Sequence, residues 1–324
     1  MKASLLLFAS SIGRNSDKDA IFNAWCSQVG ISCPGAEVRS SSESVAGRGV
    51  FSTKDLSIGE EVISIPHYAA LTQYNCAAYF PDLERELSSV RDKGNTKRSY
   101  LKRIWHRMKR RPTSEKSNDD ETWPAELTAY ALEAIETEHP WSTWISQWKR
   151  DDPFQNLVDI SSWRNDDAIR VAVADFHKMA PAVPECKIGA ALGIRLHELE
   201  VYSSRYTNKV PTSESLYCTL MSRAVGLSDS VAAVLPMHDM INHSPNPNLG
   251  LAFAEDETFK LIALENIPKD SELFLSYKTV IDDNGKWDED KACWLLVHWG
   301  IPSSQSEMSQ VTDHAFYKNV MSLR

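Results

Sequence analysis

Residues 235–248 read Leu-Pro-Met-His-Asp-Met-Ile-Asn-His-Ser-Pro-Asn-Pro-Asn, a run of polar groups and turn formers that follows the apolar stretch 231–235. The spacing of His238 and His243 matches no familiar zinc motif. The chain also lacks the Gly-x-Ser-x-Gly elbow that carries a hydrolase nucleophile. We therefore interpret the segment as a loop that hydrogen-bonds a ligand with mixed donors and acceptors. A turn whose polar groups satisfy one another is the alternative.

The composition of the chain is that of a globular protein. Its 324 residues are 42% hydrophobic and 24% charged, which excludes whole-chain disorder, collagen and coiled coil. No apolar stretch reaches the ~18 residues that a membrane span needs. A net charge of −9 argues against a nucleic-acid partner. The six cysteines form no Cys-x-x-Cys pair, so we expect reduced thiols and no metal site.

Hydrophobic periodicity and turn signals predict strands on both sides of a helical block. Helices are expected over residues 17–29 and 287–298, and a helical pattern runs from Pro124 to about residue 228, with Gly226 as its C-terminal cap. Strands are expected at residues 50–51, 62–65, 249–254, 258–264 and 272–277. Strands that are segregated from helices in this way indicate the α+β class.

Residues 97–111 form a strongly basic segment with eight Lys or Arg around an apolar stripe. The pattern predicts a helix whose stripe packs on the core while its charges face water. Two functional alternatives are docking of an acidic partner and binding to an anionic surface.

Four short motifs occur in an order that resembles one known family. They are Gly47-Arg48-Gly49-Val50-Phe51, Ser222-Arg223-Ala224, Asp239-Met240-Ile241-Asn242-His243-Ser244 and Ser271-Glu272-Leu273-Phe274-Leu275-Ser276-Tyr277. Together they resemble a SET domain, in the branch that includes the Rubisco large-subunit methyltransferase. The resemblance implies an α+β fold with a SET-type, β-rich pseudoknotted body and an inserted helical subdomain.

The resemblance also implies a division of the chain. We expect an N-terminal helix and the first part of the body over residues 1–75, and the second part of the body over 231–285. The helical insert is expected over 76–230. A short C-terminal helical segment follows at 286–324, where the family's substrate domain is missing or vestigial.

The function implied by the resemblance is methyl transfer from S-adenosylmethionine to a protein side chain, most often the lysine ε-amine. The backbone of Ala46, Gly47, Arg48 and Gly49 is expected to line the cofactor site. The implied hydrogen-bonding partners of the cofactor are Asn242 and His243, and Arg223 is expected to reach its carboxylate. Tyr277 is the implied catalytic residue beside the transferring methyl. No metal is implied.

Two departures from the family pattern keep alternatives open. Lys278 follows Tyr277 where the family usually has Gly, and residues 298–301 read His-Trp-Gly-Ile where it has Tyr-Gly-Phe. Packing on the adenine then falls to Trp299 or Trp294. One alternative is a non-catalytic SET-like interaction module, and another is histidine as the methyl acceptor. We expect a cytoplasmic or nuclear protein, although the apolar start at residues 3–9 leaves organelle import or secretion as a further alternative.

Overall fold

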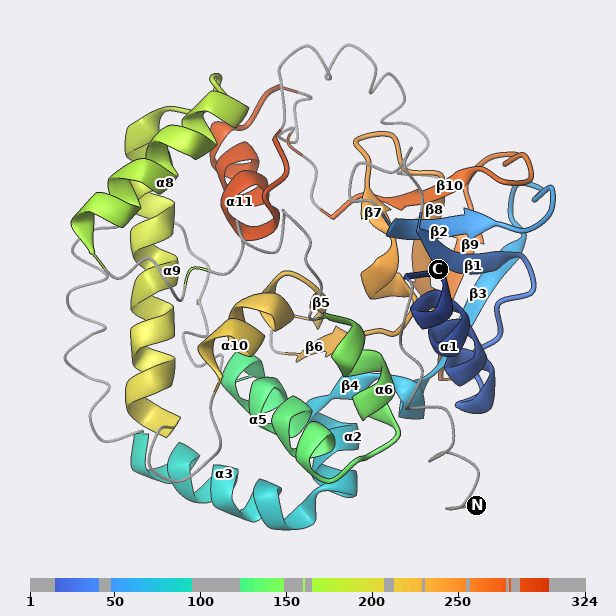
Figure 1. The fold of residues 1–324 in the computed structure, drawn as a ribbon, viewed down its shortest axis with the longest axis horizontal. Helices are drawn as coiled ribbons and strands as arrows, with labels where there is room; N and C mark the ends of the chain where they lie inside the picture. Colours follow the sequence, from blue (N-terminus) through green and yellow to red (C-terminus); the bar gives the residue numbers. More distant parts are fainter. Residues whose placement is uncertain are drawn as a thin grey trace.

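The computed structural model describes residues 15–40, 48–94, 123–148, 160, 165–206, 213–228, 231–254, 257–277, 280 and 286–302. Strands and helices are segregated in this part of the chain, which confirms the predicted α+β class (Figure 1). Several predicted features lie outside the described residues: Ala46, Gly47, Lys278 and the basic segment 97–111.

The first sheet brings three of the four motifs together. Its strands follow the order β1 (Ala36–Ser40), β2 (Arg48–Ser52), β10 (Glu272–Leu275) and β7 (Asn242–His243). Strand β10 lies antiparallel to β2 and parallel to β7, so it joins the Gly-Arg-Gly motif to the Asn-His motif. The predicted strand 272–277 is two residues shorter than expected, and Tyr277 follows its end.

Two three-stranded sheets complete the β structure. One has the order β3 (Glu61–Pro66), β9 (Thr258–Ala263) and β8 (Leu249–Phe253), and β8 and β9 pair as the expected antiparallel neighbours. Burial alternates strictly along β9, which is the pattern of a strand with one face on a core. The other sheet has the order β4 (Leu71–Thr72), β6 (Val231–Val234) and β5 (Val225–Ser228).

Most helices lie between β4 and β5 in the sequence. The helices are α1 (Asn15–Gln28), α2 (Gln73–Tyr79), α3 (Pro81–Gly94), α5 (Trp123–Glu136), α6 (Trp141–Ile145), α8 (Asp166–Met179), α9 (Glu185–Tyr206), α10 (Glu214–Met221) and α11 (Glu289–Trp299). Short 3₁₀ turns occur at η1 (His67–Ala69), η2 (Ser146–Trp148) and η4 (His238–Met240). Helix α9 packs against both α8 and α11, on the side of the molecule away from the first sheet (Figure 1).

The helical block ends earlier than the sequence pattern indicates. Helix α10 ends at Met221, where the Ser222 N–H caps the last turn by bonding to its carbonyls. Gly226, predicted as a helix cap, instead pairs with Ala232 within the β5–β6 ladder. The prediction was wrong because the neighbouring strand β6 supplies backbone partners that sequence periodicity does not reveal.

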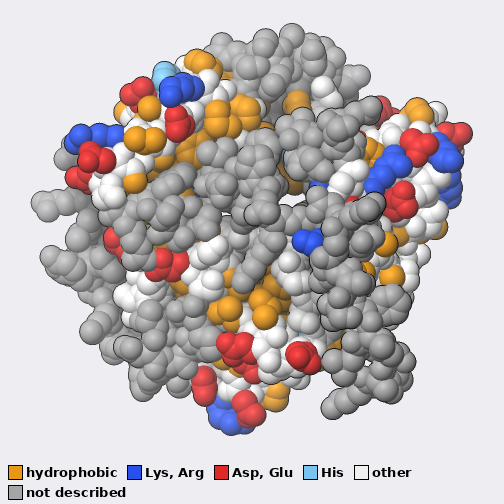
Figure 2. Space-filling view, viewed as in Figure 1, with side chains coloured by type: hydrophobic (Ala, Val, Ile, Leu, Met, Phe, Trp, Pro, Cys, Tyr) orange, Lys and Arg blue, Asp and Glu red, His pale blue; other side chains and the backbone are white. Residues whose placement is uncertain are grey.

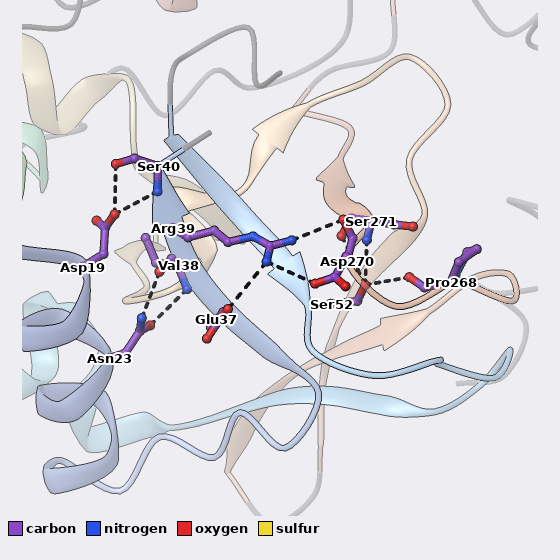
Figure 3. Close-up of polar contacts among 10 residues, drawn as sticks. All are labelled: Asp19, Asn23, Glu37, Val38, Arg39, Ser40, Ser52, Pro268, Asp270 and Ser271. Carbon is purple, nitrogen blue, oxygen red and sulfur yellow. Dashed lines mark hydrogen bonds and ion pairs between the residues drawn. The ribbon is translucent and has the colours of Figure 1, made fainter. Parts of the chain in front are cut away.

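Helix α1 is fixed to the first sheet by two polar side chains (Figure 3). The Asp19 carboxylate accepts hydrogen bonds from the backbone N–H and hydroxyl of Ser40, at 2.8 and 2.9 Å. The Asn23 amide bonds both backbone groups of Val38. The helix also stacks Trp25 on Trp144 of α6, with ring centroids 6.0 Å apart. These contacts join the N-terminal helix both to the first sheet and to the helical block.

The surface of the described part is mixed in charge. On the face shown in Figure 2, acidic and basic side chains are interspersed where the residues are described. Among the described residues, Lys187 of α9 forms ion pairs with Glu289 and Asp290 at the start of α11, at 2.9 and 2.8 Å. All six cysteines lie in described segments, and none forms a disulfide. Within the same segments, no helix is both long and apolar enough to cross a membrane.

Candidate active site

Asn242 connects the strands that carry the motifs. Its Nδ2 donates to the backbone oxygen of Arg48 on β2 at 2.9 Å and to Glu272 Oε1 on β10 at 2.6 Å. An amide nitrogen has two hydrogens, so both are used in these bonds. These two bonds fix the orientation of the Asn242 side chain between β2 and β10.

Gly49 and Glu272 are in close contact at the same point. A Cβ at position 49 would lie 2.4 Å from Glu272 Oε1 and 3.1 Å from Asn242 Nδ2. The absence of a side chain at Gly49 thus leaves the space that the Glu272 carboxylate needs to reach Asn242. This requirement gives a physical reason for the second glycine of the Gly-Arg-Gly motif.

Tyr277 lies over the segment that contains Asn242 and His243. Its backbone N–H donates to His243 Nδ1 at 3.1 Å, and its hydroxyl donates to the Ile241 carbonyl at 2.5 Å. Burial lowers the pKa of His243 to about 4, so Nδ1 is an unprotonated acceptor near neutral pH. Burial also raises the pKa of Tyr277, an effect that Arg223 opposes and Asp239 reinforces. The Tyr277 hydroxyl is therefore a protonated donor.

Arg223 reaches the same segment from the end of the helical block. Its Nη1 donates to the Asp239 backbone oxygen at 2.8 Å and lies 3.6 Å from the Asp239 carboxylate. The Arg223 side chain is 18% exposed. Its Nε is buried and has no hydrogen-bond partner among the residues that the structure describes. The exposed fraction of the side chain is the part that a second anion can reach.

Asp239 is buried and is contacted by several polar side chains. It belongs to a sequence motif, but the motif did not reveal this role. Its Oδ2 accepts hydrogen bonds from the indole N–H groups of Trp144 and Trp148, at 3.0 and 2.9 Å. Burial raises the pKa of Asp239, whereas Arg223 and the two indole donors lower it. The carboxylate thus joins the helical block to the Asn-His segment. A carboxylate in an apolar stretch was the available sequence signal, but it could not identify the tryptophans.

Three further predicted residues have clear positions. The Arg48 side chain turns toward α1, where its Nε pairs with Asp19 at 2.8 Å, so the backbone of Arg48 is the part that faces Asn242.

Trp299 lies beside Tyr277 with ring centroids 5.9 Å apart, and its indole N–H donates to the Ser222 carbonyl at 2.8 Å. Trp294 packs on His298 instead, with ring centroids 4.0 Å apart. Of the two tryptophans, Trp299 is therefore the one in ring contact with Tyr277.

The structure thus gathers the predicted residues Arg48, Gly49, Arg223, Asn242, His243 and Tyr277 around residues 239–243. Sequence reasoning did not single out Glu272 or Asp239, which orient two of them. No group of three or more His, Cys, Asp or Glu residues suited to a metal occurs within the described segments.

A family profile described as SET domain matches residues 47–278, which is most of the chain. The chain belongs to the SET-domain family. Among curated proteins, the N-lysine methyltransferase SETD6 of Bos taurus is 21% identical over 299 residues, covering 86% of this chain and 55% of the relative. The Mus musculus protein of the same name is 22% identical over 319 residues, covering 92% of this chain and 57% of the relative. The chain therefore spans a little more than half the length of these curated relatives.

A solved structure supports the same fold. Rubisco LSMT bound to sinefungin and monomethyllysine superposes with a TM-score of 0.57 at 13% identity, covering 90% of this chain and 57% of that chain. This match confirms the fold class expected from the resemblance, a SET-type body with a helical insert.

Proposed function

We propose that this protein transfers a methyl group from S-adenosylmethionine to a protein side chain, the lysine ε-amine being the favoured acceptor. The observation that carries the proposal is the meeting of Asn242, Tyr277 and Arg223 around one short segment of a SET-type fold. The curated relatives are N-lysine methyltransferases by name, which favours lysine over histidine.

The residues of the site fit the proposed cofactor. The partly exposed Arg223 side chain suits the carboxylate of the amino-acid end, because a guanidinium can bind a carboxylate through two parallel hydrogen bonds. Asn242, whose side chain is fixed by its bonds to β2 and β10, is the proposed hydrogen-bonding partner of the cofactor. The Trp299 ring, next to Tyr277, offers an aromatic surface for the adenine. Ala46 and Gly47 complete the proposed set, with the backbone of Arg48 and Gly49, and His243 is the remaining proposed contact.

The proposed roles in the reaction follow from the protonation states. When bound, S-adenosylmethionine supplies a methyl group on a sulfonium, which an amine attacks in line. Tyr277 keeps its proton and is anchored through Ile241, so its role is to orient the reacting groups and not to act as a base. The acceptor lysine has to be neutral, and losing its proton at pH 7.4 costs about 4 kcal/mol in water. A buried site beside a sulfonium lowers that cost, because burial and a like charge both depress the pKa of an amine.

A ligand titration followed by labelling tests the proposal. S-adenosylhomocysteine should raise the melting temperature in a saturable way, by an amount that corresponds to about 2.7 kcal/mol at 100 times the dissociation constant. Incubation of a cell lysate with the protein and labelled cofactor, followed by mass spectrometry, should then locate methyl-lysine. Cofactor binding without labelling would favour a non-catalytic SET-like interaction module. Label on histidine would show that histidine, and not lysine, is the acceptor.

Two wider expectations belong to the proposal. We infer a cytoplasmic or nuclear site of action, supported by six cysteines without a disulfide, as is common in reducing compartments. The basic segment 97–111 remains a proposed docking site for an acidic partner, on the evidence of its eight basic residues.

A further inference from the structure

The Asp239 carboxylate lies at the junction of three parts of the chain. Its side chain has no exposed surface. Trp144 comes from α6 and Trp148 from η2, and both indoles, themselves fully buried, donate to the same oxygen of Asp239. Arg223, which follows α10, approaches that oxygen to 3.6 Å and also bonds the Asp239 backbone carbonyl. One residue therefore collects three donors from the helical block.

This arrangement restricts where the Arg223 guanidinium can lie. A buried carboxylate is stable only with donors and a countercharge close to it, so moving Arg223 away leaves an uncompensated charge. The two indole donors fix the carboxylate in turn, because each comes from a rigid, packed ring. The guanidinium is thereby held at a set position, while 18% of the Arg223 side chain stays exposed.

The same residue leads directly into the rest of the site. Asp239 belongs to η4, and Ile241, two residues later, accepts the hydrogen bond from the Tyr277 hydroxyl. Arg223 and Tyr277 therefore contact the same short stretch of backbone, on residues two apart. The position of Asp239 sets the separation between the group proposed to bind the cofactor carboxylate and the group proposed to lie beside the methyl.

We propose that Asp239 is a positioning residue, which holds the Arg223 guanidinium in the place where it binds the carboxylate of the cofactor's amino-acid end. The inference rests on the proposed function. If it holds, Trp144 and Trp148 of the helical block contribute to cofactor affinity indirectly. Their indole N–H groups bond Asp239 and not the ligand.

A double-mutant cycle read out by S-adenosylhomocysteine binding tests this inference. Asp239→Asn puts an amide in place of the carboxylate and should weaken binding about tenfold or more, the range for losing a hydrogen bond to a charged group. In an Arg223→Met background, the same Asp239 change should alter the dissociation constant less than threefold, because Asp239 acts only through Arg223. Asp270→Asn is the matched control, since that carboxylate is 60% exposed and pairs with Arg39.

A second variant covers the case in which Asp239→Asn does not fold. Trp148→Phe keeps an aromatic ring but removes one donor to Asp239, and should weaken binding several-fold in the wild-type background only. Effects of either change that add to that of Arg223→Met would show a general structural role and overturn the inference. Unchanged affinity in Asp239→Asn would also overturn it. If the wild-type protein binds no S-adenosylhomocysteine, the proposed function fails first and the inference fails with it.

Discussion

The hydroxyl of Tyr277 donates a 2.5 Å hydrogen bond to the backbone carbonyl of Ile241, the residue that precedes the Asn242-His243 pair. The Tyr277 backbone N–H bonds His243 Nδ1 as well, so one tyrosine is held to this segment at both its backbone and its side chain. Such double attachment fixes the hydroxyl, which is the property that a preorganised polar group at a reacting centre requires.

Removal of the Tyr277 hydroxyl tests whether this group is only structural or also catalytic. Tyr277→Phe keeps the ring and leaves the Ile241 carbonyl without its donor, so we expect a loss of about 1–3 kcal/mol in the free energy of unfolding. Turnover should fall roughly 100- to 1,000-fold, by analogy with the loss of one preorganised group. Cofactor affinity should change much less. Single-turnover methylation beside a cofactor titration measures both, and turnover within threefold of wild type would refute the catalytic role.

Arg223 should control cofactor affinity. Arg223→Ala should weaken S-adenosylhomocysteine binding by about 2–5 kcal/mol, since it removes one partner of a buried charge pair. Arg223→Lys should recover only part of this loss, because an ammonium cannot form two parallel hydrogen bonds to a carboxylate. Isothermal titration calorimetry measures both variants.

The Arg223→Ala change also leaves the Asp239 carboxylate buried without its countercharge, so the variant should unfold more easily. Binding is therefore compared at a temperature where circular dichroism shows each variant folded. Arg85→Ala, which removes a side chain that is 77% exposed, is the surface control. Equal cofactor affinity of Arg223→Ala and wild type would show that Arg223 only neutralises Asp239 and does not bind the cofactor.

The donor role of Asn242 predicts the effect of a charge introduced there. In Asn242→Asp, a carboxylate replaces the amide that gives hydrogen bonds to Glu272 and the Arg48 carbonyl, so acceptors face acceptors. We expect a loss of about 2–4 kcal/mol in the free energy of unfolding at pH 7.5, from two lost hydrogen bonds and like-charge repulsion. Chemical denaturation measures this loss.

Exchange of donor and acceptor provides the control. Adding Glu272→Gln to Asn242→Asp restores a donor opposite an acceptor across the β7–β10 pair, and should recover about half of the lost stability. Glu272→Gln alone should cost less stability than Asn242→Asp, because the amide oxygen can still accept from Asn242 Nδ2 but carries no charge. Strictly additive effects of the two changes would contradict the pairing.

The motif strands were predictable because their signals are local. Hydrophobic alternation and bounding turns indicated β2, β8, β9 and β10, and the order of motifs indicated that distant segments meet. The resemblance then placed Asn242 and Tyr277 together, and the β7–β10 pairing agrees with that placement.

Features that depend on long-range partners were not predictable. Strand β5 forms because β6 lies beside it, which the helix-like pattern before it concealed. The hydrogen bonds from Trp144 and Trp148 to Asp239 join residues 95 and 91 positions apart in the sequence, so hydrophobic periodicity cannot indicate them. Arg223 was predicted from a three-residue motif, yet its pairing with Asp239 emerges only in the folded chain.

Two partly buried histidines, His238 and His243, should make stability depend on pH. Burial lowers the pKa of His238 and of His243 to about 4 each, whereas an unfolded histidine titrates near 6.5. Between these values the unfolded chain takes up protons that the folded chain does not, so the free energy of unfolding is highest above pH 6.5 and falls as the pH drops toward 4. Each pKa unit is worth ~1.36 kcal/mol, which gives about 2 kcal/mol for each histidine between pH 7.5 and pH 5. The Asp239 carboxyl, whose pKa burial raises, contributes a slope of the opposite sign.

Urea denaturation at pH 7.5, 6.5, 5.5 and 5 tests this dependence in three proteins. The free energy of unfolding of the wild type should fall across the series. In His238→Gln, only the part of this pH dependence that is due to His243 should remain. In the folded protein His243 stays largely neutral down to its pKa of about 4, so its bond from the Tyr277 N–H, and cofactor affinity with it, should change little from pH 7.5 to 5. His197→Gln is the control, because that side chain is 60% exposed on α9 and should leave the pH profile as in wild type. A wild-type free energy of unfolding that is flat from pH 7.5 to 5 would mean that the folded protein does not lower the pKa of these two rings.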